Sequence, residues 1–320
     1  MMTSGRPSLR AAQAFFCGSA LIAATSAFAQ ADPDPAEPVP PEHFMTSPGG
    51  VDMRSGQYIY EHTDLSLGAP ESGIGIELVR TNDNGKGNTA RFAQFSHNWE
   101  IYVTESAWKQ HSAGDYVVSN PPPGTQMSVT VRGKSATFRG GTGYGTFNSA
   151  SGPYARLEKT QSGSTYFYKY YANDGTMVTF RPVNANQCPS APMSKCAYAS
   201  DMTLTNGVSY TLNYDSSDGT LLKSVVSNTG YALLFEYVTI GTRKQISKAC
   251  AINLSVQTLP TTCPAGVQTA TYTYQTDGRF MTQTTDSASK VWKFHNTSDG
   301  TSANYTMSYF YPGSTTPYLV

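Results

Sequence analysis

Six dipeptides in which Asn or Asp precedes Gly punctuate this chain, and they constrain its fold more than any other feature. Such dipeptides accept the positive φ angles that tight hairpin turns require. Most connections are therefore predicted to be antiparallel hairpins. The dipeptides are Asn84-Gly85, Asp174-Gly175, Asn206-Gly207, Asp218-Gly219, Asp277-Gly278 and Asp299-Gly300.

The segments around these turns alternate apolar and polar residues with the period of a β-strand. Charged residues are only 14%, whereas Tyr supplies 21 residues and Gly 28, a balance that favours strands and turns. No helical period is sustained, so the predicted class is all-β. The predicted strands are 57–61, 76–80, 99–104, 126–131, 165–171, 209–214, 231–238, 269–274 and 291–295.

The first 29 residues are predicted to be a signal peptide. Arg6 and Arg10 precede an almost uncharged, largely apolar run, and Ala27-Phe28-Ala29 has the small-x-small pattern that signal peptidase cleaves. Cys17 lacks the preceding residues that lipid attachment needs, and the apolar run is too short to span a membrane. We therefore expect export to the periplasm, the cell surface or the medium, with no membrane span.

After cleavage the chain is predicted to open with a Pro-rich linker over residues 30–49, which is expected to be disordered. Loss of Arg6 and Arg10 leaves 20 basic residues against 22 acidic ones, with no block of like charge. A nucleic-acid partner requires a basic face, so the charge argues against that class of function.

The mature chain retains four cysteines, an even number that suits an oxidising compartment. Three connectivities are possible. The local pairs Cys188–Cys196 and Cys250–Cys263 are favoured, because each would fix a short polar loop that contains Pro. Zinc binding is disfavoured because there is no Cys-x-x-Cys and no nearby histidine.

Two segments near the C-terminus align as repeats. Tyr214 to Leu222 lies over Tyr274 to Met281 with one residue of difference in length, and each segment carries a turn with Asp before Gly. The match continues, with Val226-Ser227-Asn228 over Thr285-Asp286-Ser287 and Leu233-Leu234-Phe235 over Trp292-Lys293-Phe294. Aligned aromatic residues and turns over this length indicate true repetition.

These repeats resemble the YD repeats of RHS proteins, which begin with Tyr-Asp and continue through a Gly-containing turn to an aromatic strand. Upstream segments resemble the N-terminal part of an RHS region, so the likeness covers about residues 50 to 311. These segments are Val51 to Gln57, Thr63 to Leu67, Leu78 to Asn82, Phe95 to Trp99 and Asp174 to Phe180.

The resemblance implies curved antiparallel sheets of tandem hairpins, open rather than closed into a shell, because few repeats are visible. It divides the chain into an RHS N-terminal-like region (50–200) and YD-like repeats (201–320), with a Cys-containing insertion at 240–264 expected to be a loop. Gln275 stands where the repeat has Asp, and no toxin-like domain or self-cleavage motif follows. The resemblance therefore implies a truncated or degenerate portion of a wall-associated or toxin-delivery scaffold, with further RHS-repeat segments as partners.

No enzyme site is predicted from the residues. The five histidines, His43, His62, His97, His111 and His295, lack paired metal spacing. The Asp residues before Gly are explained by turns, and Glu77, Glu158 and Glu236 lie in strands without a partner that the sequence identifies. No cofactor is expected, and the oligomeric state is left open.

The alternative is a cell-surface carbohydrate-binding module. Aromatic faces stack on the apolar faces of sugar rings, and Trp99, Trp108 and Trp292 are the candidate stacking residues. An exposed row of aromatic residues would favour this function, whereas buried alternation would favour a scaffold.

Overall fold

The structure is a computed structural model that describes residues 59–83, 91–108, 124–132, 134–141, 144–149, 155–183, 188, 195–298 and 305–317. The predicted leader (1–29) and linker (30–49) lie outside the described residues, as do the dipeptides Asn84-Gly85 and Asp299-Gly300. All the described residues belong to one unit, Met45–Val320.

The described elements are strands apart from one turn of 3-10 helix, Pro70–Ser72, and the strand pairs are antiparallel, which confirms the predicted all-β class. The strands are β1 (Ile59–Ala69), β2 (Ile74–Asp83), β3 (Ser96–His97), β4 (Tyr102–Trp108), β5 (Gly124–Val131), β6 (Lys134–Gly141), β7 (Gly145–Asn148), β8 (Arg156–Ser162), β9 (Thr165–Tyr171), β10 (Met177–Pro182), β11 (Lys195–Thr203), β12 (Ser209–Tyr214), β13 (Leu222–Ser227), β14 (Tyr231–Ile240), β15 (Arg243–Asn253), β16 (Gln268–Tyr274), β17 (Met281–Thr285), β18 (Val291–Ser298) and β19 (Tyr305–Phe310).

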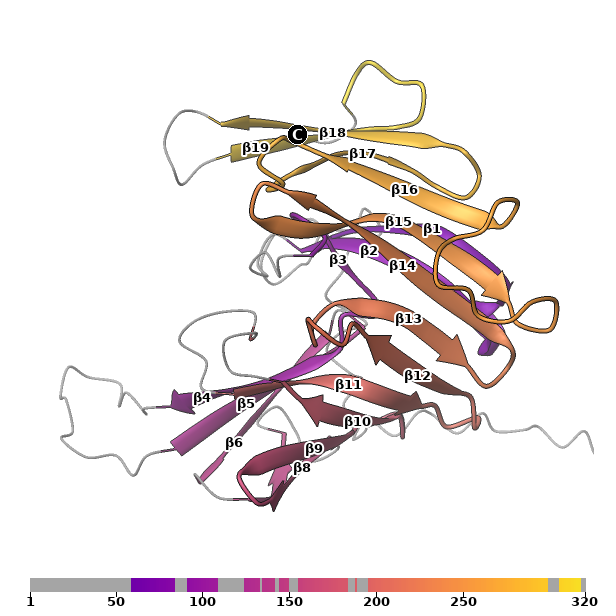
Figure 1. Cartoon of the computed structure of the whole chain (residues 1–320). Helices are drawn as coiled ribbons and strands as arrows, with labels where there is room; N and C mark the ends of the chain where they lie inside the picture. Colours follow the sequence, from indigo (N-terminus) through magenta and orange to yellow (C-terminus); the bar gives the residue numbers. More distant parts are fainter. Residues whose placement is uncertain are drawn as a thin grey trace, which may run out of the picture. The chain divides into compact units, whose positions relative to one another are not determined.

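Strands β7 to β19 pair in chain order and form one meandering sheet (Figure 1). The sheet as a whole does not close, as predicted, because among the described strands β19 pairs only with β18. It forks at β11. One half of that strand pairs with β4, which leads on to β5 and β6, and the other half pairs with β12.

Strands β1 and β2 form a separate hairpin, here called the opening hairpin, which pairs with the short β3. It crosses the strands from β12 to β19: Tyr210 of β12 donates to the carbonyl of Gly75, and Tyr272 of β16 donates to Asp64. At the far end Asn82 hydrogen-bonds Tyr309 of β19. The 11 residues of β1 reach roughly 34 Å, and eight strands occupy about the same distance, so the hairpin is long enough to cover both repeat units.

The two sequence repeats occupy equivalent positions in the sheet. Tyr214 pairs with Leu222 directly after a bulge, and Tyr274 pairs with Met281 directly after a bulge. The equivalence continues into the next strand pair. Val226 pairs with Ala232 in the first unit, and 59 residues later Thr285 pairs with Val291 in the second.

The segment 240–264 was expected to be a loop outside the sheet, and this expectation is wrong. Its residues Arg243–Asn253 form β15, which pairs along its length with β14 and also with β16. The prediction failed because lysines and serines interrupt the apolar pattern of a strand that is buried on both faces. Ile246 and Ala249 are buried on one face, and Cys250 and Ile252 on the other. Only the stretch after Asn253 leaves the sheet.

The predicted turn geometry holds at Gly175, Gly207 and Gly278, which have φ values of 81°, 83° and 68°. It is wrong at Gly219, which does not adopt a positive φ. The longer turn there is fixed by side chains instead: Asp218 accepts from the Thr220 backbone at 3.1 Å, and its own carbonyl accepts from Leu221 at 2.9 Å.

Candidate functional site

The opening hairpin holds a buried ion pair at its contact with β16. Arg80 donates from Nε and Nη2 to the two oxygens of Asp64, both at 3.0 Å, and Tyr272 donates to the same carboxylate at 2.9 Å. Both charged side chains are completely buried. The Arg80 guanidinium also lies 4.8 to 5.3 Å from the ring centres of Tyr60, Phe95 and Phe294.

Burial by itself lowers the pKa of Arg80, but the adjacent Asp64 carboxylate outweighs it and raises the pKa above the usual value. Asp64 lies at a bulge in β1, where the register shifts between Thr63 and Leu65. Both oxygens of this carboxylate accept hydrogen bonds, Oδ1 from Arg80 and Oδ2 from Arg80 and Tyr272. We assign the group to the packing of the hairpin, not to proton transfer.

A second polar group joins the hairpin to the turn between β17 and β18. His62 lies 3.2 Å from Asp286, and the Trp292 indole donates to the same carboxylate oxygen at 3.0 Å. The Ser287 backbone donates to the Asp64 carbonyl at 3.0 Å. Burial lowers the pKa of His62 despite the neighbouring carboxylates.

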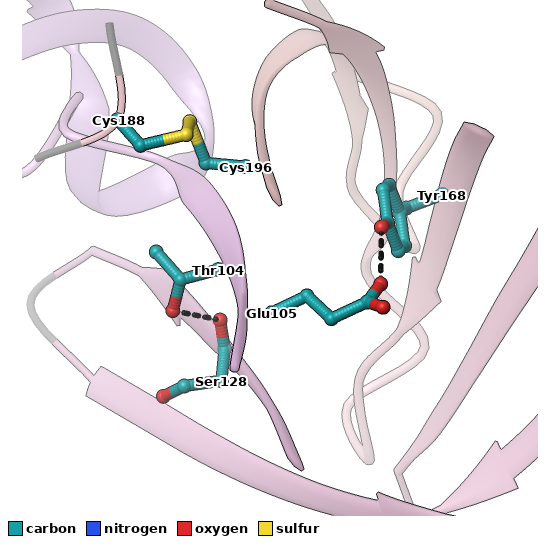
Figure 2. Close-up of a disulfide and its surroundings, with 6 residues drawn as sticks. All are labelled: Thr104, Glu105, Ser128, Tyr168, Cys188 and Cys196. Atoms are coloured by element: carbon teal, nitrogen blue, oxygen red, sulfur yellow. Dashed lines mark hydrogen bonds between the residues drawn. A yellow bond between two sulfur atoms is a disulfide. The ribbon is translucent and has the colours of Figure 1, made fainter. Parts of the chain in front are cut away.

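A third polar group is centred on Glu105 of β4, and its hydrogen bond with Tyr168 is drawn in Figure 2. Tyr168 donates to Glu105 at 2.6 Å, Lys159 approaches both carboxylate oxygens at 3.0 and 2.8 Å, and Lys195 lies 3.9 Å away. Burial, followed by the hydrogen bond to Glu105, raises the pKa of Tyr168. The site is closed, because the Glu105 and Lys159 side chains are 6% and 0% exposed, so its donors hold β4 against β8 and β9.

The cysteines lie in the favoured local pairs, with Cα atoms 5.6 Å apart for Cys188–Cys196 and 5.8 Å for Cys250–Cys263. The first bridge is the one drawn beside the Glu105 group (Figure 2). The second joins β15 to the loop that follows it. That loop covers Leu234 and Ile252 on the face of the sheet opposite the main core.

Of the three tryptophans predicted to stack on sugar rings, one is buried. Trp99 is 1% exposed, packs on Tyr210 with ring centres 4.9 Å apart, and donates to the Glu77 carbonyl at 2.7 Å. A stacking role for Trp99 is therefore wrong, because its ring is buried in the core. Trp292 is partly buried against His62, and the Trp108 side chain lies outside the described residues.

Two of the strand glutamates, Glu158 and Glu236, have partners that the sequence did not identify. Glu158 contacts Arg156 at 3.2 Å and Tyr171 at 3.1 Å, and Glu236 accepts from the Cys263 backbone at 2.6 Å. Sequence reasoning also missed Asp64, Arg80 and Glu105 as buried charges. The position of Arg80 two residues after the buried Leu78 is the one available signal, since residues two apart share a strand face.

His97 is fully buried between Phe235 and Phe92, with ring centres 5.6 Å from each. Its Nδ1 accepts from the Trp99 backbone at 3.2 Å. Burial lowers the pKa of His97 to about 3, so the ring is neutral near pH 7. His43 and His111 lie outside the described residues, and within those residues no three His, Cys, Asp or Glu side chains are grouped as metal ligands.

The β19 edge is the remaining candidate for a functional surface. Among the described strands, β19 pairs only with β18. Tyr311 directly follows it and is 53% exposed, with its ring centre 5.7 Å from that of Trp292. An open strand edge offers backbone groups to a further strand.

Comparisons with known proteins give structural similarities at low identity. No protein-family model and no curated protein matches the chain. Two crystal structures of TcdB2-TccC3, one of them TcdB2-TccC3-TEV, match 78% and 75% of the chain with TM-scores of 0.41 and 0.43 and identities of 10% and 12%. This chain spans only 16% of those chains.

The N-terminal domain of effector protein SpvB from Salmonella typhimurium strain LT2 matches 77% of this chain and 92% of its own length. The identity is 13% and the TM-score 0.30. Among the described residues, no helix has the length and apolar character needed to cross a membrane.

Proposed function

We propose that this protein is a non-enzymatic, exported β-repeat scaffold, a portion of an RHS-type wall-associated or toxin-delivery protein. The equivalence of the two repeat units carries the proposal. The two units share the register of their strand pairs, the position of a bulge and the hydrogen bond of the turn at Gly230 and Ser289, so each unit supplies an edge on which the next unit builds.

The chemistry of the buried charges supports a structural role. The Asp64 side chain is completely buried and the Glu105 side chain is 6% exposed, and each carboxylate accepts hydrogen bonds from side chains of other strands. A carboxylate that works as an acid or base needs access to the reacting group. The two disulfides are typical of a protein that folds in an oxidising compartment, which suits export.

The test is an activity screen with purified mature protein on glycans and peptides, alongside Glu158→Gln and Glu236→Gln. The side chains of Glu158 and Glu236 are only partly buried, whereas that of Asp64 is fully buried. A scaffold gives no turnover above the buffer rate for any of the three proteins. Turnover that one variant abolishes without lowering the melting temperature would overturn the proposal.

Carbohydrate binding remains a second candidate because the ring centres of Trp292 and the exposed Tyr311 lie 5.7 Å apart near the β19 edge. Such a pair can stack on a sugar ring. A glycan array probed with the mature protein and with Tyr311→Ala tests this function. Binding that Tyr311→Ala abolishes would favour it, and an array without signal would remove it.

A further inference from the structure

The position of β19 in the repeat has a direct counterpart in β15. In the first unit, Phe235 pairs with Ala249 and Glu236 with Lys248. In the second, Phe294 pairs with Tyr309 and His295 with Ser308. Strand β19 therefore takes the place in its unit that β15 takes in the preceding one.

The other edge of β15 binds the first strand of the following unit. Lys248 pairs there with Thr271 of β16. The same arrangement occurs one unit earlier, where Asp201 of β11 pairs with Thr211 of β12. In both cases a threonine of the incoming strand lies opposite the same position of the preceding strand. Ser308 occupies that position on β19.

We propose that the edge of β19 binds the first strand of a third repeat unit, carried by another polypeptide segment, in the register in which β15 binds β16. The inference rests on the scaffold function proposed above and specifies its partner. In this register Ser308 lies opposite the residue equivalent to Thr271. The exposed fractions of two equivalent residues are consistent with this register. Ala251, next to β16, is 3% exposed, whereas its counterpart Tyr311, after β19, is 53% exposed.

The two existing opening strands define the chemistry of this partner. In β12 and β16 the outward positions hold Thr211, Asn213, Thr271 and Thr273, which are exposed, while the inward positions are buried. Both strands end in a tyrosine, Tyr214 or Tyr274. The partner is therefore an extended segment that alternates Thr or Asn with apolar or aromatic residues and ends in Tyr, with backbone pairing for affinity.

Cross-linking with a peptide of residues 266–276 tests both the binding and its register. The protein carries Ser308→Cys in a Cys17→Ser background, since the other four cysteines are in disulfides. Peptides carry Thr271→Cys or, as a matched control, Tyr272→Cys. Directly opposite residues in an antiparallel pair are about 4.5–5.5 Å apart, within the range of a disulfide, whereas adjacent residues point to opposite faces.

We expect at least about tenfold more cross-linked product with the Thr271→Cys peptide than with the Tyr272→Cys peptide in a glutathione buffer, because only the former is opposite Ser308. The protein with Thr315→Cys, an exposed position beyond β19, should show no such preference. Equal yields from both peptides with Ser308→Cys would overturn the inference. Dimers linked through Ser308→Cys would also overturn it, since a second copy would then occupy the edge.

The activity screen described above, run on the same preparation, separates the two proposals. A protein without turnover that fails to cross-link retains the scaffold function and loses the β19 partner. A protein with turnover that still cross-links in register retains the partner strand and loses the non-enzymatic function.

Discussion

Gly230 and Ser289 lie at the same turn position of the two repeat units, 59 residues apart, and both adopt a left-handed backbone, with φ values of 89° and 60°. Each backbone N–H donates three residues back, Gly230 to the Ser227 carbonyl at 3.2 Å and Ser289 to the Asp286 carbonyl at 2.9 Å. The turn is thus conserved between the units in geometry, although only one unit has glycine there.

Ser289→Gly should stabilise the protein and Gly230→Ser should destabilise it, each by roughly 0.5–1 kcal/mol, because a side chain disfavours the left-handed region. An added Cβ at Gly230 meets no atom within 4 Å, so its cost is conformational. Urea unfolding of both variants measures the two effects. Changes of the same sign would contradict the equivalence of the two turns.

Asp64→Asn should lower the free energy of unfolding by about 3–5 kcal/mol, because it leaves the buried Arg80 charge without its counter-charge. The double variant Asp64→Leu with Arg80→Met should recover much of the loss, since no unpaired charge then remains. Arg279→Gln is the control: its side chain is 65% exposed, and its loss should cost less than about 0.5 kcal/mol. Equal effects of Asp64→Asn and Arg279→Gln would remove the structural role assigned to the ion pair.

His97 should make the protein less stable in acid. The unfolded chain binds a proton at His97 below about pH 6.5, whereas the folded state binds it only near pH 3. Between these values the unfolded state carries the extra proton, so stability falls as the pH falls, by up to about 1.4 kcal/mol per pH unit. His97→Gln should flatten the pH dependence of urea unfolding between pH 6 and pH 4, roughly the middle of that window. An unchanged slope would show that the folded state accepts a proton on His97 readily.

Peptide mapping without reduction should link Cys188 with Cys196 and Cys250 with Cys263, and long-range linkages would contradict the structure. Replacing Cys250 and Cys263 by alanine should cost about 2–4 kcal/mol, because the bridge restrains the unfolded chain and holds the loop over Leu234 and Ile252. Trypsin lacks a site between Asn253 and Val267, so chymotrypsin is the suitable probe of that loop. Faster cleavage after Leu254 in the alanine variant is the expected result, since Leu259 precedes Pro260 and is not a cleavage site.

Mass spectrometry of the exported protein should give an N-terminus at or next to Gln30, because Ala27-Phe28-Ala29 is the cleavage pattern that follows the apolar run. Ala29→Asp should block processing, since a charged residue does not fit where signal peptidase requires a small one. An intact Met1 in the exported wild-type protein would refute the predicted leader.

The features that could be predicted from the sequence are those controlled by local chemistry. Period-two alternation specified strands, glycine after Asn or Asp specified turns at Gly175, Gly207 and Gly278, and matched aromatic residues revealed the repeat. Each signal lies within a few residues of the structure it specifies. The turn prediction was wrong at Gly219, where hydrogen bonds of the Asp218 side chain fix the turn. The strand prediction missed β15, where burial on both faces removes the alternation of apolar and polar residues.

Which charged side chains meet depends on the tertiary structure and could not be predicted. Asp64 is bound by Tyr272, which lies 208 residues away, and Glu105 by Lys159, which lies 54 residues away. The tertiary structure also placed Trp99 in the core and β4 beside β11. These outcomes depend on how the opening hairpin and the fork at β11 pack on the main sheet. Strand alternation says which face a residue occupies but not which distant strand covers that face.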